Sequence, residues 1–265
     1  MLLGALASLR EAGVYGVASR YALFGTLALQ GSLLIVAPQV ARLSSRGSFR
    51  ALQELYQTVT WWLVTLSFPF YLLLILFPSP FLRIFGNSFE AGTTTLVVVS
   101  AFMLVNIATG PVSVVLLMMG KSSWNLANTI MTIVASIGLS VILIPQMGIT
   151  GAAVAWGVSI MVENLIPLLQ IWRLHGLHPF GGGFLRASGT AIMTVGTIGC
   201  GVRLFGSDTM VGAIETVTIG GPLFAVLIYR QRHALRLDLL IDSLRPMGRR
   251  RSSGAAPLGN DGGVG

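Results

Sequence analysis

Long apolar segments without charged side chains alternate with short polar ones along this chain. Residues 21–41, 55–82 and 122–162 contain no Asp, Glu, Lys or Arg. A helix needs about 20 residues, at about 1.5 Å each, to cross the hydrocarbon core of a bilayer. The pattern therefore predicts an all-α integral membrane protein with about seven transmembrane helices, at residues 14–40, 58–77, 94–118, two within 125–172, 185–204 and 209–229.

The segment 125–172 organises this prediction. It overlaps the uncharged run 122–162, whose 41 residues are about twice the length of one spanning helix. Pro145 disfavours helix at the residue before it and has no amide hydrogen to donate, while Gly148 and Gly151 allow a tight reversal. The segment therefore predicts a helical hairpin whose two arms each span the membrane.

Shorter segments lie between and beyond the predicted spans. Residues 44–57 place apolar side chains on one helical face and charged ones off it, which is typical of an amphipathic helix in the membrane interface. A kink is expected at Gly110-Pro111. Four parts result: a remnant of a truncated helix with an outer turn (1–13), a transmembrane helical lobe (14–229), an interfacial segment (230–248) and a disordered basic, glycine-rich tail (249–265).

The composition also indicates a membrane protein. Apolar residues make up 54% of the chain and charged residues 10%, against about 25% charged in soluble domains. The net charge of +8 lies in loops and in the tail, so membrane lipids are expected as partners and nucleic acid is not. Cys200 stands alone in an apolar run, so no intramolecular disulfide is expected.

The distribution of Lys and Arg predicts the orientation. Thirteen of the 17 fall on one side of the predicted membrane, three fall on the other, and Arg20 lies inside the first span. Positive residues accumulate on the cytoplasmic side of membrane proteins. We therefore expect a multi-pass protein of the plasma (inner) membrane, with Met1 outside and the C-terminus in the cytoplasm.

The hairpin sequence also carries a resemblance. Its pattern Leu143-Ile144-Pro145-x-x-Gly148-x-x-Gly151-Ala152-Ala153, preceded by Pro111 and Met119-Gly120-Lys121, resembles the polysaccharide (O-antigen, lipid-linked oligosaccharide) flippases of the multidrug/oligosaccharidyl-lipid/polysaccharide exporter superfamily. Phe85-Gly86 and residues 13–20 extend the match, which covers roughly residues 3–173.

The resemblance implies both a fold and a function. The family has a fourteen-helix, two-lobed plan, and this chain resembles helices eight to fourteen, the C-terminal half, so a missing N-terminal lobe is an expected partner. The implied function is transport and not catalysis: a flippase that moves polyprenyl-diphosphate-linked oligosaccharide across the membrane for cell-surface polysaccharide biosynthesis. A cation-coupled multidrug exporter lobe of the same superfamily and a membrane-embedded glycosyl- or acyltransferase subunit remain alternatives.

Four polar residues within the predicted spans are candidate site residues. Arg20 lies more than one turn inside the first span; it either snorkels to the outer interface or lines a cavity, where its planar guanidinium binds the diphosphate of the substrate. Glu163 and Asn164 lie near the middle of the fifth span. A polar link between helices is expected for Glu163, with a proton- or cation-coupling role as the alternative. Asn106, before the Pro111 kink, is expected to bond a neighbouring helix or to line a cavity.

No metal site, cofactor or catalytic set is expected. His175 and His178 lie three residues apart without a third ligand nearby. Gly181-Gly182-Gly183 lacks the spacing of a nucleotide-binding loop. The spans contain no Ser/His/Asp or Cys/His arrangement for nucleophilic catalysis.

The charge asymmetry predicts the topology in a testable way. Reporter fusions after Arg251 and within residues 42–54 should report the cytoplasm, and fusions within residues 78–90 should report the exterior, because the arginine-rich loops are retained inside. Paired phosphatase and fluorescent-protein fusions measure this. An exterior signal from the tail would contradict the predicted orientation.

Overall fold

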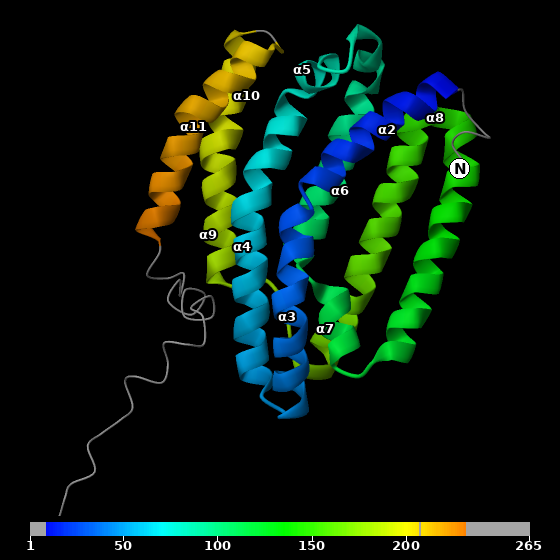
Figure 1. Ribbon diagram of the computed structural model, residues 1–265, viewed down its shortest axis with the longest axis vertical. Coiled ribbons are helices and arrows are strands. Elements are labelled where there is room, and N and C mark those ends of the chain that lie inside the picture. The colour runs from blue at the N-terminus through cyan, green and yellow to red at the C-terminus, as the bar shows by residue number, and fades with distance from the viewer. Residues whose placement is uncertain (1–8, 207, 232–265) are drawn as a thin grey trace, which may run out of the picture.

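The computed structural model describes residues 9–206 and 208–231, and within them the chain forms helices and no strand. The expected N-terminal remnant begins before this range, and the predicted interfacial segment and tail lie, from residue 232 onward, outside the described residues. The helices pack side by side in a bundle (Figure 1). Their bounds are α2 Leu9–Phe24, α3 Leu27–Ser45, α4 Phe49–Leu76, α5 Pro78–Arg83, η1 Asn87–Gly92, α6 Thr93–Thr109, α7 Val112–Met118, α8 Ser122–His175, α9 Gly182–Ala191, η2 Ile192–Gly196, α10 Thr197–Phe205 and α11 Met210–Arg230.

Five helical segments of the described chain are long and apolar enough to cross a membrane. They are Leu27–Ser45, Phe49–Leu76, Asn87–Met118, Ser122–His175 and Met210–Arg230. Many large apolar side chains are exposed on the protein surface, including Leu34 at 83% exposure and Leu204 at 77%. Such a surface is suited to contact with lipid, because contiguous exposed apolar patches are unfavourable in water.

Helix α8 confirms the predicted helical hairpin. Gly148, with a φ of 55°, interrupts the helix, and the arms 122–147 and 149–175 lie side by side (Figure 1). The side-chain amides of Asn128 and Gln170 exchange two hydrogen bonds, of 2.7 and 3.0 Å, between the arms. The hairpin is therefore closed by a glycine turn at one end and tied by an amide pair in its other half.

The first predicted span consists of two helices. α2 and α3 are separated at Gly25-Thr26, where the backbone makes a tighter turn than an α-helix. Hydroxyl groups of α4 stabilise this break: Tyr71 donates to the carbonyl of Ala22 (2.7 Å) and Ser67 donates to the carbonyl of Gly25 (3.1 Å). A free carbonyl in apolar surroundings is costly, so these donors make the break tolerable.

Helix α4 replaces two predicted elements. The sequence predicts an interfacial helix at 44–57 and a span at 58–77, but Phe49–Leu76 is one continuous helix of 28 residues. Leu52 and Tyr56, assigned to the membrane interface, are fully buried against α3, α7 and the end of α8. The interfacial prediction is therefore wrong, because the amphipathic face finds an apolar partner inside the protein.

The third predicted span is kinked as expected. α6 ends at Thr109, α7 begins at Val112, and Gly110 between them has a φ of 63°. The hydroxyl of Tyr56 donates a 2.6 Å hydrogen bond to the carbonyl of Thr109. The side chain of Thr60 occupies the space where a Cβ at Gly110 would lie, so glycine is required there by both conformation and packing.

The predicted spans 185–204 and 209–229 both correspond to helical segments. α9, η2 and α10 follow one another without interruption, and η2 is a π-helical stretch. The guanidinium of Arg203 donates to the carbonyl of Leu76 at 2.6 Å. This bond satisfies a backbone carbonyl in the last turn of α4 and joins α4 to α10.

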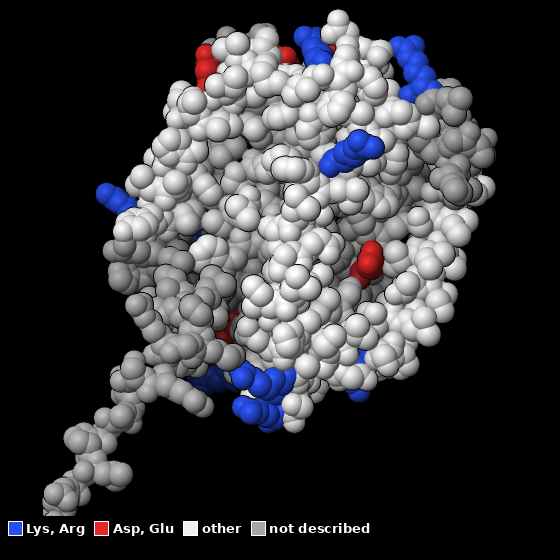
Figure 2. All heavy atoms as spheres, in the orientation of Figure 1, with Lys and Arg blue, Asp and Glu red and all other residues white. Residues whose placement is uncertain are grey.

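Charged side chains gather at the two ends of the bundle. Between the ends, the face shown in Figure 2 carries very few charges. One end, at the bottom of Figures 1 and 2, holds the α3–α4 and α7–α8 junctions and the end of α8. We call it the arginine-rich end, after Arg42, Arg46, Arg50, Lys121 and Arg173.

Because the two hairpin arms lie so close together, a single added methyl group between them should destabilise the protein. A Cβ at Gly151 would overlap the backbone carbonyl of Leu143, whereas a Cβ at Gly138 would meet no atom within 4 Å. Gly151→Ala should lower the free energy of unfolding by about 1–3 kcal/mol, because the added methyl group would push the backbones of the two arms apart. Denaturant unfolding in detergent micelles measures it, with Gly138→Ala as the matched control. Equal stability of the two variants would contradict the packing of the arms.

Candidate functional site

A cavity of about 360 Å³ lies between the two helix breaks and the second arm of α8. Three of the four candidate residues, Asn106, Glu163 and Asn164, line it. The other polar lining residues are Thr26, Gln30 and Ser113, and the remainder is apolar or backbone: Leu23, Leu29, Leu33, Met103, Gly110, Pro111, Val112, Val114, Trp156 and Ile160. The structure therefore brings together polar groups from four helices inside an apolar bundle.

Both helix breaks border this cavity. Thr26 lies at the α2–α3 break, and its hydroxyl donates to the carbonyl of Leu23 at 2.7 Å. Gly110 and Pro111 form the α6–α7 break, and Ser113 lies just after it on α7. Irregular backbone at membrane depth is tolerated where it is buried in protein or lines a polar cavity. The breaks and the cavity are therefore parts of one feature.

Asn164 holds one wall of the cavity in place. Its Nδ2 donates to Oδ1 of Asn106 (3.0 Å) and to the carbonyl of Ile160 (2.8 Å), and its Oδ1 accepts from the hydroxyl of Thr109 (3.1 Å). Tyr56 reaches the same point from α4 through the carbonyl of Thr109. Asn164 is itself buried. This network fixes α4, α6 and α8 relative to one another.

Glu163 takes no part in that network. Its side chain lines the cavity and is exposed, and it makes no hydrogen bond or ion pair with any other residue in the described chain. The helix-to-helix link expected for Glu163 is made by its neighbour Asn164 instead. The two residues point differently because consecutive positions on a helix are about 100° apart.

Arg20 lies outside the cavity. Its side chain is exposed on α2, and within the described residues it has no hydrogen bond or ion pair. Leu23, three residues later and therefore on the same face of α2, lines the cavity. Arg20 is thus one helical turn away from the cavity, and the structure does not bring it together with Glu163.

Sequence reasoning missed part of the lining. Gln30 lies in the uncharged first span, and Thr26 and Ser113 are small hydroxyl residues of the kind that occur throughout apolar helices. The polar character of Gln30 within such a span is the one signal that could have identified it. The amide pair Asn128–Gln170, outside the cavity, was missed for the same reason: each partner is a single polar residue in an apolar arm.

The lining is suited to binding a polar or cationic group. It offers one carboxylate, three amides and two hydroxyl groups, and among the described residues no three His, Cys, Asp or Glu side chains could together hold a metal ion. No family model, no curated protein and no solved structure matches this chain. The functional interpretation therefore rests on the geometry of the cavity.

The network predicts that Asn164 contributes strongly to stability. Asn164→Ala removes three hydrogen bonds of a buried side chain, so the free energy of unfolding should fall by about 1–3 kcal/mol. Gln30→Ala, in the same cavity, is the control, because the side chain of Gln30 is exposed and the expected change is within about 0.5 kcal/mol. Unfolding in mixed micelles measures both, and similar losses in the two variants would refute this role.

Proposed function

We propose that this chain is a lobe of an integral membrane transporter and that the cavity between the helix breaks belongs to its transport route. The observation that supports this most directly is Glu163, a carboxylate that faces a polar cavity inside helices long enough to cross a membrane. Ionisable groups at such positions are costly to insert and mark substrate or ion pathways. Transporters also build their sites from discontinuous helices, and two broken helices border this cavity.

For the substrate, we propose a polyprenyl-diphosphate-linked oligosaccharide, so that the protein is a flippase of cell-surface polysaccharide biosynthesis. The sequence resemblance suggests this class, and Arg20 is the supporting residue. Its guanidinium has no partner among the described residues, and a planar fork of donors suits the oxygens of a diphosphate. In this proposal the chain works with an N-terminal lobe in the plasma membrane, with its C-terminus in the cytoplasm.

A cation-coupled exporter lobe is the second candidate, and Glu163 is the observation that favours it. A carboxylate that lines a cavity and has no partner among the described residues can bind a proton or a small cation during transport. In the flippase proposal, by contrast, its charge is not needed for the transport step. The two candidates therefore differ in what Glu163→Gln does.

The flippase proposal predicts a loss of export on substitution of Arg20. In the complete gene product, expressed in a strain without its own flippase, Arg20→Ala should lower polysaccharide export by about 10- to 100-fold, as for loss of a charge-assisted hydrogen bond. Arg20→Lys should retain part of the activity, because it keeps the charge and loses the fork. Protein abundance should stay normal, and lipid-linked intermediates should accumulate on the inner leaflet. Arg173→Ala, exposed at the arginine-rich end, is the control.

The same assay separates the two candidates. Glu163→Gln keeps the shape and most of the hydrogen-bonding capacity and removes the titratable proton, so a flippase should retain export. A variant that is abundant and inactive, together with cation-dependent dye efflux by the wild type, would identify the exporter. Wild-type export by Arg20→Ala would remove the support for a diphosphate substrate.

A further inference from the structure

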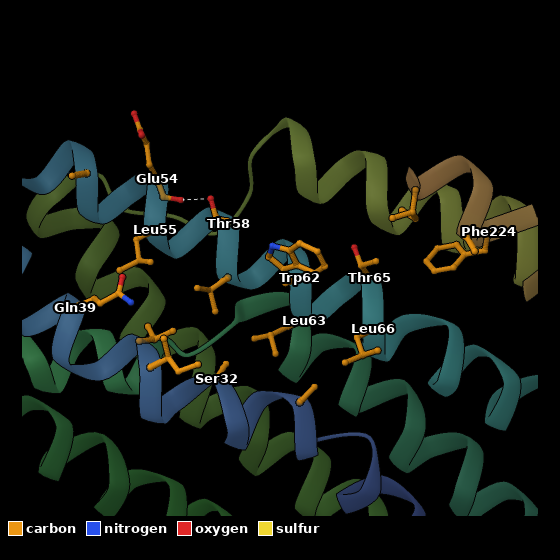
Figure 3. Close-up of a pocket in the computed structure, with 17 residues that line it drawn as sticks. Ser32, Gln39, Glu54, Leu55, Thr58, Trp62, Leu63, Thr65, Leu66 and Phe224 are labelled. Carbon is orange, nitrogen blue, oxygen red and sulfur yellow. Dashed lines mark hydrogen bonds between the residues drawn. The ribbon is translucent and has the colours of Figure 1, made fainter. Parts of the chain in front are cut away.

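A second, larger cavity lies on the other side of α3. It is a groove of about 730 Å³ between α3, α4 and α11, and it falls within the range of about 300–1,000 Å³ typical of small-molecule sites. Its lining is mostly apolar, and Figure 3 shows Leu55, Leu63, Leu66 and Phe224 along it. A groove of this composition takes a hydrocarbon chain in preference to a polar ligand.

The length of the groove matches one leaflet of a bilayer. Along α4 it extends from Ala51 to Leu66, which corresponds to about 22 Å of helix. One leaflet contributes about 15 Å of hydrocarbon, half of the core, and the headgroup layer adds the rest. The groove can therefore hold one acyl chain of a lipid whose headgroup lies level with the start of α4.

The end of the groove near Ala51 is the arginine-rich end. Arg42 follows the lining residue Gln39 by three positions on α3, and Arg50 precedes the lining residue Glu54 by four positions on α4, so each stands about one helical turn beyond a lining residue at this end of the groove. Both arginines are exposed. Arg50 and Glu54 approach to 3.9 Å, but the side chain of Arg50 is 96% exposed, and such surface pairs are weak.

We propose that this groove binds one anionic diacyl phospholipid from the leaflet at the arginine-rich end. One acyl chain lies along α4 between α3 and α11, and the phosphate is bound by Arg42 and Arg50. Guanidinium groups bind phosphate oxygens through paired, charge-assisted hydrogen bonds. Glu54 adds one negative charge at the mouth of the groove, and Arg42, Arg46 and Arg50 leave the positive charge in excess. Binding of a phospholipid in this groove does not require that the protein be a transporter.

Native mass spectrometry of the full chain tests the proposal. The protein is released from vesicles with equal amounts of palmitoyl-oleoyl phosphatidylglycerol and phosphatidylcholine, and retained lipids are counted. The wild type should retain one phosphatidylglycerol at least about fivefold more often than phosphatidylcholine, since each basic residue near an anionic lipid contributes about this factor. Equal retention of the two lipids would overturn the proposal.

Two sets of variants locate the lipid. Arg42→Gln with Arg50→Gln should abolish the preference for phosphatidylglycerol, whereas Lys121→Gln with Arg173→Gln, which removes two charges at the same end away from the groove, should preserve it. An equal loss in both pairs would reduce the effect to general surface charge and refute a site.

A third variant fills the groove itself. Ala225→Trp adds a ring to an exposed lining position of α11 and should lower retention of both lipids. If this variant does not fold, the two double variants that remove arginine or lysine charges still test the proposal. Dimers without bound lipid would show that a second copy of the chain occupies the groove and would overturn the proposal.

Discussion

In hydrocarbon, a backbone carbonyl needs a hydrogen-bond donor from the protein itself, and the two broken helices of this bundle depend on donors from α4. The hydroxyl of Tyr71 donates a hydrogen bond to the carbonyl of Ala22 at the α2–α3 break. The hydroxyl of Tyr56 does the same for the carbonyl of Thr109 at the α6–α7 break. Both tyrosines are fully buried. A single continuous helix therefore makes the two discontinuous ones possible.

This arrangement also explains why polar side chains collect in one place. Each break turns its helix so that side chains near it border a common space with the second arm of α8. Asn164 bonds Asn106 and Thr109, so one wall of the cavity is held by specific hydrogen bonds. Glu163 lines the same cavity and makes no such bond to any residue in the described part of the chain. The amide of Asn164 therefore fixes the shape of the cavity wall, and the carboxylate of Glu163 lines its interior.

The hairpin and the kink at Gly110 could be predicted because Pro145, Gly148 and Pro111 change the local backbone directly. The break at Gly25-Thr26 could not be predicted, because it depends on hydroxyls of α4 that lie about 40 to 50 positions away in the chain. The candidate residues Asn106, Glu163 and Asn164 were found because polar side chains are rare within spans. Their individual contacts were not predictable, because neighbouring positions on a helix face different partners, as Glu163 and Asn164 do.

Helix α3 forms a shared wall of both cavities, and its periodicity explains how. Thr26, Gln30 and Leu33 line the polar cavity, whereas Ala28, Ser32, Val36 and Gln39 line the apolar groove. Each set repeats with helical spacing, and the offset of two residues between the sets corresponds to about 200°, so they occupy opposite faces. The polar and apolar compartments are thus separated by the width of one helix. A rigid displacement of α3 that widens one compartment narrows the other, so a ligand that fills the compartment to be narrowed opposes that displacement.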